Sequence, residues 1–370
     1  MESDISTKRL EPSQLQQAAS LLQRGGVVAF PTETVYGLGA NAFAPEAIAK
    51  IFEAKGRPSD NPLIAHIADI EQLSLLASEV PELATLLFNA FWPGPLTLVL
   101  KKQPAVPNEV TAGLDTVAIR MPRDPIAREL IRLADTPLVA PSANRSGKPS
   151  ATTWQAVLED LEGRIDAVVC GDPTQLGIES TVIDVTSREP VILRHGSITE
   201  EMIAEVLRDA PEKNSKIVAS QISSVAPHAS NNIELEKRSP GTRHRHYQPQ
   251  AQVRLCSVIE GNVTEGKVTE RKVTEGTPID NPLAQPTEPW AWIGLSAPPK
   301  QLASIPKRVE VCDSIEVYAS KLYTFFRSCD AEAIPTIYCE KVPAKGLGRA
   351  LMDRLSRAAA SADGPADAIK

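Results

Sequence analysis

The sequence predicts an α/β protein with a mixed, twisted sheet, followed by a second and smaller α/β unit. Short apolar runs beside glycine, proline or polar residues, such as VVAF and LTLVL, are typical of buried strands. Segments with apolar residues at helical spacing lie between them, but strands and helices do not follow a regular βαβ repeat. That irregular order favours a mixed sheet over a strictly parallel one.

The composition is that of a globular chain. Its 370 residues suggest two or three domains, and 42% hydrophobic residues are enough to bury a full core. A formal net charge of −7 argues against a general nucleic-acid coat but leaves room for a local basic cleft. The five cysteines are scattered without a CxxC pair, which predicts free thiols in a reducing compartment. With a polar start and no long apolar run, the chain is expected to be cytoplasmic, without a signal peptide or membrane contact.

Residues 1–209 are predicted to form the first domain. Apolar spacing predicts helices over residues 10–24, 44–54, 71–91 with breaks near Pro81, 124–133 and 200–208. Strands are predicted at VVAF, at residues 63–69, 96–100, 116–121, 167–171 and 180–185, and in PLVAPSAN and VILRHG. Gly25-Gly26 stops the first helix and Arg57-Pro58 breaks the second.

Residues 210–250 are predicted to be a linker, because the apolar pattern fades into Ser, Ala, Asn and Lys. Residues 251–362 are predicted to form the small second unit, with strands at VRLCSVI, WAWIGL, RVEVC and IPTIYCE and helices over 314–327 and 347–360. Within it, residues 263–276 form a five-residue near-repeat that we interpret as a solvated loop insertion. Residues 363–370 are expected to be a flexible tail.

The stretch from Pro31 to Pro62 concentrates polar chemistry at the ends of predicted strands and helices. The polar side chains of interest in this stretch are Thr32, Thr34, Tyr36, Lys55, Arg57 and Asn61, and the predicted strand that follows it adds His66. Cations and hydroxyls at such ends suit an anionic ligand, for example a nucleotide phosphate. The alternative is that Lys55 and Arg57 are ordinary cations at a helix C-terminus, where the macrodipole favours them.

Other loops share this character, because each places a polar residue directly after an apolar strand. They are Arg120 in AIRMP, Ser142 to Ser150 in PSANRSGKPS, Glu179 to Thr181 in GIESTVI, and Arg194 at the end of ILR. If these loops face one cleft, they would bind a polar small molecule. The alternative is that strand ends are polar in any protein.

Several familiar site motifs are missing from the sequence. Ser180 lies in GIEST and not in GxSxG, so no nucleophile elbow is predicted. There is no GxxxxGK[ST] loop and no GxGxxG before a helix, so a nucleotide would have to bind in another way. His66 and His195 are isolated and are more typical of structural histidines than of metal ligands. His244 and His246 form an HxH in a basic loop, which suits either a metal or an anion.

Seven motifs occur in the order found in the YrdC-like family: PTETVYGLG, KGRPSDNPL, WPGPLTLVL, AIRMP, APSANRSGKPS, ESTVID and ILRHG. SPGTRHRHYQP and GLGRALMDRLSRAA resemble the family's long, two-domain form, so the resemblance extends from about Leu10 to Ala360. It implies a twisted N-terminal domain with a concave cleft and a Rossmann-like C-terminal domain. The family makes L-threonylcarbamoyladenylate from L-threonine, bicarbonate and ATP and releases pyrophosphate, the first step of threonylcarbamoyladenosine modification of tRNA.

The resemblance also implies residue roles. Threonine would be held by Thr34, His66, Arg120, Ala140 and Ser180. ATP would be held by Arg57, Asn61, Thr116, Ser142, Asn144, Ser150 and Arg194. Lys55 and Arg57 are the implied catalytic residues that neutralise the phosphates, and Mg²⁺ would come with ATP and not on dedicated protein ligands. No covalent enzyme intermediate is expected. A downstream threonylcarbamoyl transferase system that acts on tRNA would take the product, and no stable complex with nucleic acid is expected.

One segment departs from the family pattern SPGMxYxHYxP, whose first tyrosine covers the ligand. His244 stands at that tyrosine and Thr242 at the methionine, while Tyr247 is retained. His244 and Tyr247 are therefore the expected lid residues, and His244 would either stack on the nucleotide or lose the contact. Two alternatives to the synthase are a non-catalytic RNA-binding module of the same fold and a carbamoyltransferase-like activity. The acidic charge argues against the first, and the cysteine spacing and chain length against the second.

Overall fold

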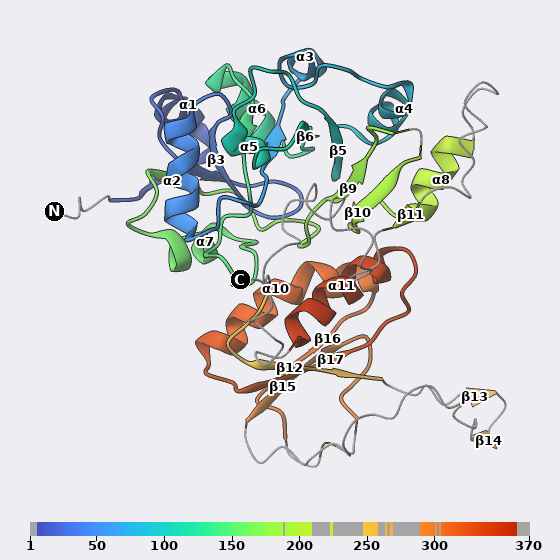
Figure 1. Ribbon diagram of the computed structural model, residues 1–370. Helices are drawn as coiled ribbons and strands as arrows, with labels where there is room; N and C mark the ends of the chain where they lie inside the picture. Colours follow the sequence, from blue (N-terminus) through green and yellow to red (C-terminus); the bar gives the residue numbers. More distant parts are fainter. Residues whose placement is uncertain are drawn as a thin grey trace, which may run out of the picture.

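A mixed sheet of eleven strands organises the N-terminal domain (Figure 1). The computed structural model describes residues 6–187, 189–208, 223–224, 247–257, 263–264, 267–268, 289–299, 302 and 305–360. The strand order is β1-β8-β2-β3-β7-β4-β6-β5-β9-β10-β11. The strands are β1 (Lys8–Leu10), β2 (Val28–Phe30), β3 (Gly37–Asn41), β4 (Ile64–His66), β5 (Leu96–Lys101), β6 (Thr116–Arg120), β7 (Leu138–Val139), β8 (Ala167–Val169), β9 (Thr181–Asp184), β10 (Val191–Arg194) and β11 (Ser223–Ser224).

The sheet contains both parallel and antiparallel pairs, which confirms the predicted mixed α/β class. β4 pairs with β6 in parallel, for example, whereas β5 pairs with β6 in the antiparallel direction. The helices of the domain are α1 (Leu15–Gln23), α2 (Pro45–Lys55), α3 (Leu73–Leu76), α4 (Glu82–Phe91), α5 (Asn108–Thr111), α6 (Pro125–Ala134), α7 (Trp154–Leu161) and α8 (Glu200–Arg208), with 3₁₀ turns at Pro12–Gln14 and Ile70–Gln72.

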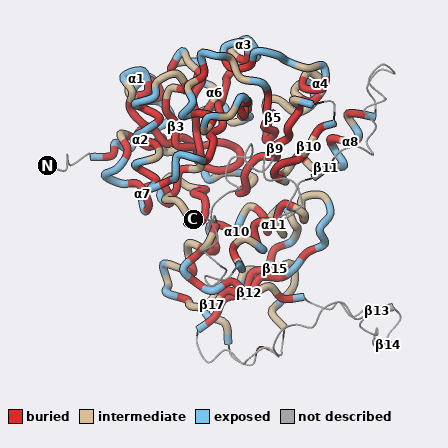
Figure 2. Tube along the Cα trace, in the orientation of Figure 1, coloured by how far each residue is buried: buried red, intermediate tan, exposed pale blue. Residues whose placement is uncertain are grey.

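Apolar side chains fill both faces of the sheet. One cluster packs α2 and α4 against one part of it, and another packs α1 and α6 against the other. Figure 2 shows the strands as buried, whereas the outer sides of α1, α3 and α4 are exposed. The helix periodicity in the sequence follows from this arrangement, because each helix buries one stripe against the sheet.

β3 and α7 are among the elements of the first domain that the sequence pattern did not predict. β3 reads GLGAN, and two glycines with an asparagine have a low strand propensity. Gly39 is needed there because a Cβ would lie 2.6 Å from Cε1 of Phe30 on the neighbouring strand β2. α7 follows the polar loop at 142–150, and its start is marked by the Thr153 side chain, which accepts a hydrogen bond from the backbone N–H of Ala156.

The C-terminal domain contains a four-stranded parallel sheet, which confirms the predicted small α/β unit. Its order is β12-β17-β15-β16. The elements are β12 (Gln252–Cys256), β15 (Trp290–Gly294), β16 (Arg308–Val311), β17 (Thr336–Glu340), α10 (Ile315–Ala331) and α11 (Leu347–Ala359). Figure 1 shows α10 and α11 between this sheet and the N-terminal domain. The second domain therefore meets the first through its helices.

Some predicted segments lie largely outside the described residues. Of the predicted linker 210–250, the structure describes only residues 223–224 and 247–250. The expected lid residue His244 therefore lies outside the described residues. Of the predicted loop insertion, the described parts are β13 (Val263–Thr264) and β14 (Lys267–Val268), which form an antiparallel pair. The predicted tail 363–370 also lies outside them. No helix in the described part of the chain is both long enough and apolar enough to span a membrane.

The two domains approach each other closely at Gly177. This glycine has a φ of +70°, and a Cβ at its position would lie 2.4 Å from the Cα of Ser320 on α10. Nearby, the hydroxyls of Thr152 and Thr324 are 2.9 Å apart. An ion pair between Arg349 on α11 and Glu200 on α8 joins the domains at another point. The interface is thus built from backbone contact as well as polar side chains.

Candidate active site

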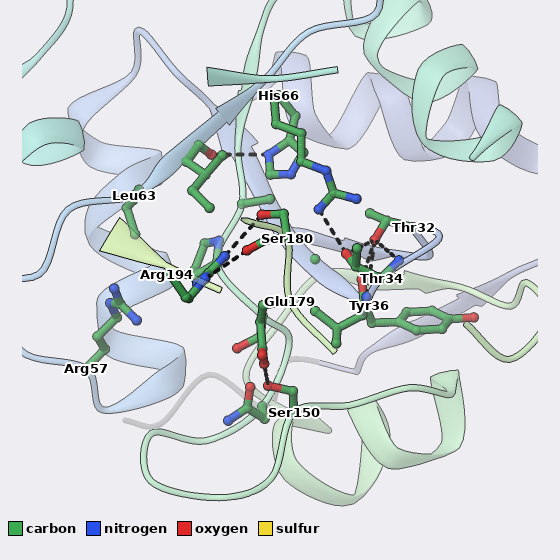
Figure 3. Close-up of a pocket in the computed structure, with 18 of the residues that line it drawn as sticks. Thr32, Thr34, Tyr36, Arg57, Leu63, His66, Ser150, Glu179, Ser180 and Arg194 are labelled. Atoms are coloured by element: carbon green, nitrogen blue, oxygen red, sulfur yellow. Dashed lines mark hydrogen bonds between the residues drawn. The ribbon is translucent and has the colours of Figure 1, made fainter. Parts of the chain in front are cut away.

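One pocket in the N-terminal domain gathers polar residues from all of the loops singled out in the sequence (Figure 3). The expected site residues that line it are Thr34, Arg57, His66, Arg120, Ala140, Ser142, Asn144, Ser150, Ser180, Arg194 and Tyr247. In Figure 3, Arg57 lies at one side and Thr34 at the other, with Ser180 and Arg194 between them. The parallel pairing of β4 and β6 sets His66 opposite Arg120 at the same strand ends.

Three of the expected residues that the structure describes do not line this pocket. Lys55 is 2% exposed, and its ammonium group donates to the backbone carbonyls of Ser142 and Asn144. Asn61 is fully buried, and its carbonyl lies 3.4 Å from Nη2 of Arg57. Thr116 begins β6 whereas the pocket residue Arg120 ends it, four residues along the strand or roughly 13 Å apart.

Arg120 is held by three groups at the Thr34 side of the pocket. Its Nη1 donates to Oγ1 of Thr34 at 2.8 Å, and its Nε donates to the carbonyl of Gly94 at 3.3 Å. Its Nη2 lies 2.8 Å from Oε1 of Glu33, and both side chains are buried. Burial raises the pKa of Glu33, but the charge and hydrogen bonding of Arg120 outweigh it, so the pKa lies below its usual value. No role for Glu33 was predicted from the sequence.

Ser180 has the partners of a binding residue and not of a nucleophile. Its Oγ lies 2.8 Å from Oγ1 of Thr97 and 3.1 Å from Nη2 of Arg194, which donates to it. Arg194 also donates from Nε to the Ser180 carbonyl at 3.0 Å. Neither side-chain partner is a base at neutral pH, in keeping with the missing nucleophile motif. Thr97, inside the apolar strand β5, was not singled out in the sequence.

His66 is a neutral imidazole in this pocket. Its side chain is buried, and Nδ1 lies 3.2 Å from the carbonyl of Ile64. Burial, together with the charge of Arg120, lowers the pKa of His66 to about 3. His66 can therefore offer one N–H donor and one acceptor nitrogen at neutral pH, but no charge.

Cations gather on the Arg57 side. α2 ends at Lys55, Gly56 takes a left-handed conformation, and Arg57 then lies in the pocket wall and not on the helix. Its Nη2 donates to the carbonyl of Pro62 at 3.2 Å, while its Nε has no hydrogen-bond partner in the described protein. Burial lowers the pKa of Arg57 to about 10, so it stays protonated at neutral pH. A buried guanidinium with a spare N–H suits an anion.

Lys55 supports that side indirectly. Burial, with the charge of Arg57, holds the pKa of Lys55 well below its usual value. Its two carbonyl acceptors belong to the 142–150 loop, whose Ser142, Asn144 and Ser150 line the pocket. The cation therefore anchors this loop to the end of α2.

Among the described residues that line the pocket, Glu179 is the only one with a carboxylate side chain. Its Oε1 accepts a hydrogen bond of 2.6 Å from the Ser150 hydroxyl, which Figure 3 shows. Its Oε2 accepts from two residues of the C-terminal domain, the Tyr323 hydroxyl at 3.1 Å and Nε of Arg354 at 3.0 Å. Burial raises the pKa of Glu179, but the charges of Arg354 and Arg194 outweigh it, so the carboxylate is charged at neutral pH. The described residues contain no group of three or more His, Cys, Asp or Glu that could hold a metal ion.

The mixed sheet, the parallel second domain and the polar pocket at the strand ends define a two-domain α/β protein of the YrdC-like class. Residues 20–196 match the Sua5/YciO/YrdC family model described as "Telomere recombination", and residues 198–360 match the model described as "Threonylcarbamoyl-AMP synthase, C-terminal domain". The chain belongs to the threonylcarbamoyl-AMP synthase family in its two-domain form.

Relatives match over almost the whole chain. A threonylcarbamoyl-AMP synthase from Pyrococcus abyssi is 42% identical over 351 residues, which is 95% of both chains. One from Bacillus subtilis is 44% identical over 347 residues, covering 94% of this chain and 93% of that one. The crystal structure of P. abyssi Sua5 complexed with L-threonine superposes with a TM-score of 0.77 at 37% identity, over 95% of this chain and 97% of that chain.

Proposed function

We propose that this chain synthesises L-threonylcarbamoyladenylate from L-threonine, bicarbonate and ATP and releases pyrophosphate, which makes it a nucleotidyltransferase. The observation that carries the proposal is the division of one pocket into two chemically different sides. Hydroxyls and the Arg120 guanidinium lie at one side, and the buried cation Arg57 lies at the other. A reaction that joins an amino acid to a nucleotide needs both sides within one cavity.

The threonine side would be formed by Thr34, His66, Arg120, Ala140 and Ser180. A relative with the same two-domain fold binds L-threonine in its crystal structure, which supports this part of the proposal. Arg120 already contacts Glu33 and Thr34, so its guanidinium is fixed in place before the substrate carboxylate arrives. Neutral His66 would contribute a hydrogen bond without adding charge.

ATP would be held by Arg57, Asn61, Thr116, Ser142, Asn144, Ser150 and Arg194. Arg57 and Arg194 supply charge from buried guanidinium groups. Lys55 would act through the 142–150 loop, whose carbonyls it holds. Asn61 and Thr116 do not line the pocket as described, so they would support the ATP-binding wall from behind.

The chemistry would run in two steps. The threonine amine attacks bicarbonate, and loss of water leaves a carbamate. A carbamate oxygen then attacks the α-phosphorus of ATP, the bond to the bridging oxygen breaks, and pyrophosphate leaves. The chain's own residues would align the two reactants and stabilise negative charge on the phosphates, with no covalent enzyme intermediate.

Mg²⁺ would accompany the triphosphate. The lining carboxylate Glu179 already accepts hydrogen bonds from three donors, so the donor set fits a metal held by phosphate oxygens and water better than one held by the protein. When bound, the metal would neutralise phosphate charge. The product would pass to a transferase system that modifies tRNA.

The test is pyrophosphate release by the purified full-length chain with Mg²⁺, with each substrate left out in turn. Release should require ATP, threonine and bicarbonate together, and mass spectrometry should detect the mixed anhydride. Arg57→Ala should lower release by roughly ten- to a hundredfold, because a charged hydrogen bond in such a site contributes roughly 1.5–3 kcal/mol, while the circular dichroism spectrum stays unchanged. Release without threonine would contradict the proposal. Binding of tRNA without any release would favour the RNA-binding alternative.

A further inference from the structure

The C-terminal domain reaches the pocket through Glu179. The two oxygens of this carboxylate face different domains: Oε1 accepts from Ser150 in the N-terminal domain, and Oε2 accepts from Tyr323 on α10 and Arg354 on α11. Glu179 and Ser150 line the pocket, whereas Tyr323 and Arg354 do not. The two C-terminal residues therefore act on the pocket from behind its lining, through hydrogen bonds to Glu179 and through ring contacts to Tyr247, which also lines the pocket.

Arg354 is built for this contact. Its side chain has no solvent exposure, and Nη1 forms an ion pair of 2.8 Å with Asp353 beside it. Its guanidinium lies 5.4 Å from the ring centroid of Tyr247, and that ring stacks on Tyr323 with centroids 5.5 Å apart. A fully buried arginine is costly unless its charge is paired, as it is here by Glu179 and Asp353. These contacts hold its Nε towards Glu179.

The electrostatic consequence concerns the anion side of the pocket. A carboxylate in the wall of a phosphate site repels the phosphates unless a cation compensates it. Arg354 provides that compensation from behind the wall, 3.0 Å from Oε2. It also fixes the carboxylate so that Oε1 keeps its 2.6 Å hydrogen bond to Ser150.

A second contact from the C-terminal domain supports the 142–150 loop at Pro149, directly before Ser150. Nη2 of Arg327 on α10 donates to the carbonyl of Pro149 and lies 2.8 Å from Oδ2 of Asp160. Asp160 in turn forms an ion pair with Lys148, which lines the pocket. The C-terminal domain thus holds the end of the 142–150 loop at both Pro149 and Ser150.

We propose that Arg354 and Tyr323 of the C-terminal domain are positioning residues for the reaction: they neutralise and orient Glu179, which holds Ser150 at the nucleotide side of the pocket. The inference rests on the proposed function for the identity of the nucleotide. It predicts that the second domain completes the ATP-binding wall of the first.

The experiment compares Arg354→Gln with Arg349→Gln in the full-length chain. Arg349 is a matched control, because it lies on the same helix and also bridges the domains, but neither it nor its partner Glu200 lines the pocket. Arg354→Gln should weaken ATP binding roughly tenfold or more, measured by calorimetry, and raise the KM for ATP while leaving the KM for threonine near the wild-type value. Arg349→Gln should have the wild-type affinity for ATP and the wild-type KM values for ATP and threonine.

A double-mutant cycle separates this role from general support of the fold. In a Glu179→Gln background, Arg354→Gln should cost less ATP affinity than in the wild-type background, because its hydrogen bond to that carboxylate is then already weakened, and Arg354 keeps only its contact with the Tyr247 ring. Should Arg354→Gln fail to fold, Tyr323→Phe decides the matter, since it removes only the hydroxyl that contacts Glu179. It should raise the Kd for ATP several-fold.

The outcomes are distinct. Wild-type affinity for ATP in Arg354→Gln, or in Tyr323→Phe where that variant decides, overturns the inference, and so does an equal loss in Arg349→Gln. A wild-type chain that binds ATP but releases no pyrophosphate overturns the proposed function instead. The calorimetric comparison still decides the inference in that case, because it needs no turnover.

Discussion

Arg120 and Glu33 form a buried ion pair beside the pocket, with 2.8 Å between Nη2 of Arg120 and Oε1 of Glu33. Their side chains are only 4% and 5% exposed. The same guanidinium donates to Thr34, which lines the pocket. Glu33 does not line the pocket itself, but it sets the orientation of Arg120, which does.

Glu33→Gln should destabilise the fold and weaken threonine binding. Removing one partner of a buried pair leaves an uncompensated charge and costs roughly 3–5 kcal/mol. Because Arg120 holds the pKa of Glu33 below 4.5 against the effect of burial, this stabilisation is present above pH 4.5 and is lost as the pH falls through the lower, folded-state pKa. Urea unfolding between pH 7 and pH 3 should show a shallower acid loss in the variant than in the wild type.

Glu79→Gln is the control for that series. Glu79 pairs with Lys101 at a similar distance of 2.9 Å, but both side chains are more than half exposed. Exposed pairs contribute little because solvent screens them. An equal change in the urea midpoint for both variants would show that burial does not determine the strength of the Glu33 pair.

Lys55→Met should loosen the 142–150 loop. The substitution keeps an apolar stem of similar length but leaves the part-buried carbonyl of Ser142 and the buried carbonyl of Asn144 without their donor, at a cost of roughly 1–3 kcal/mol. Hydrogen exchange of the loop amides should accelerate, and the KM for ATP should rise. Lys50→Met should change neither, because Lys50 lies on the same helix but donates to the Gly25 carbonyl at an exposed position. Unchanged exchange in Lys55→Met would disprove the anchoring role.

The sequence was sufficient to predict the strand ends that build the pocket, because polar residues directly after apolar strands converge when the sheet forms. Arg120, at the end of β6, is of this kind, but Ser180 lies directly before β9, so the predicted position after a strand is wrong for it although it does line the pocket. The sequence was insufficient for Glu33, since nothing in PTETVYG indicates that this carboxylate turns away from the cavity towards an arginine 87 residues later. The role of Arg354 could not be predicted for a related reason, because its partner Glu179 lies in the other domain. Periodicity indicates which face is buried, but not which distant element covers it.

His66 should remain neutral throughout the physiological pH range. Burial and the charge of Arg120 lower its pKa to about 3, whereas in the unfolded chain it is expected near 6.5. As the pH falls from 6.5 towards 3, the unfolded state takes up a proton that the folded state does not, so folding stability decreases over that window. An NMR titration of the imidazole should show no change between pH 8 and pH 5, and His66→Gln should flatten the stability profile below pH 6.5. A midpoint near 6.5 in the folded protein would contradict this picture.

The pocket should discriminate threonine from valine by the hydroxyl group. Valine has the shape of threonine, but it would leave the hydrogen-bonding groups of Thr34 and Ser180 without a partner at the substrate. We expect kcat/KM for valine to be lower by roughly a hundredfold or more, with serine the best of the substitutes. Thr34→Val should bring the kcat/KM values for threonine and valine closer together. Thr111→Val is the control, because that hydroxyl is equally buried, has no hydrogen-bond partner in the described protein and does not line the pocket. Equal rates with the two amino acids in the wild type would show that the hydroxyl is not recognised, and an unchanged ratio in Thr34→Val would assign the recognition to other residues.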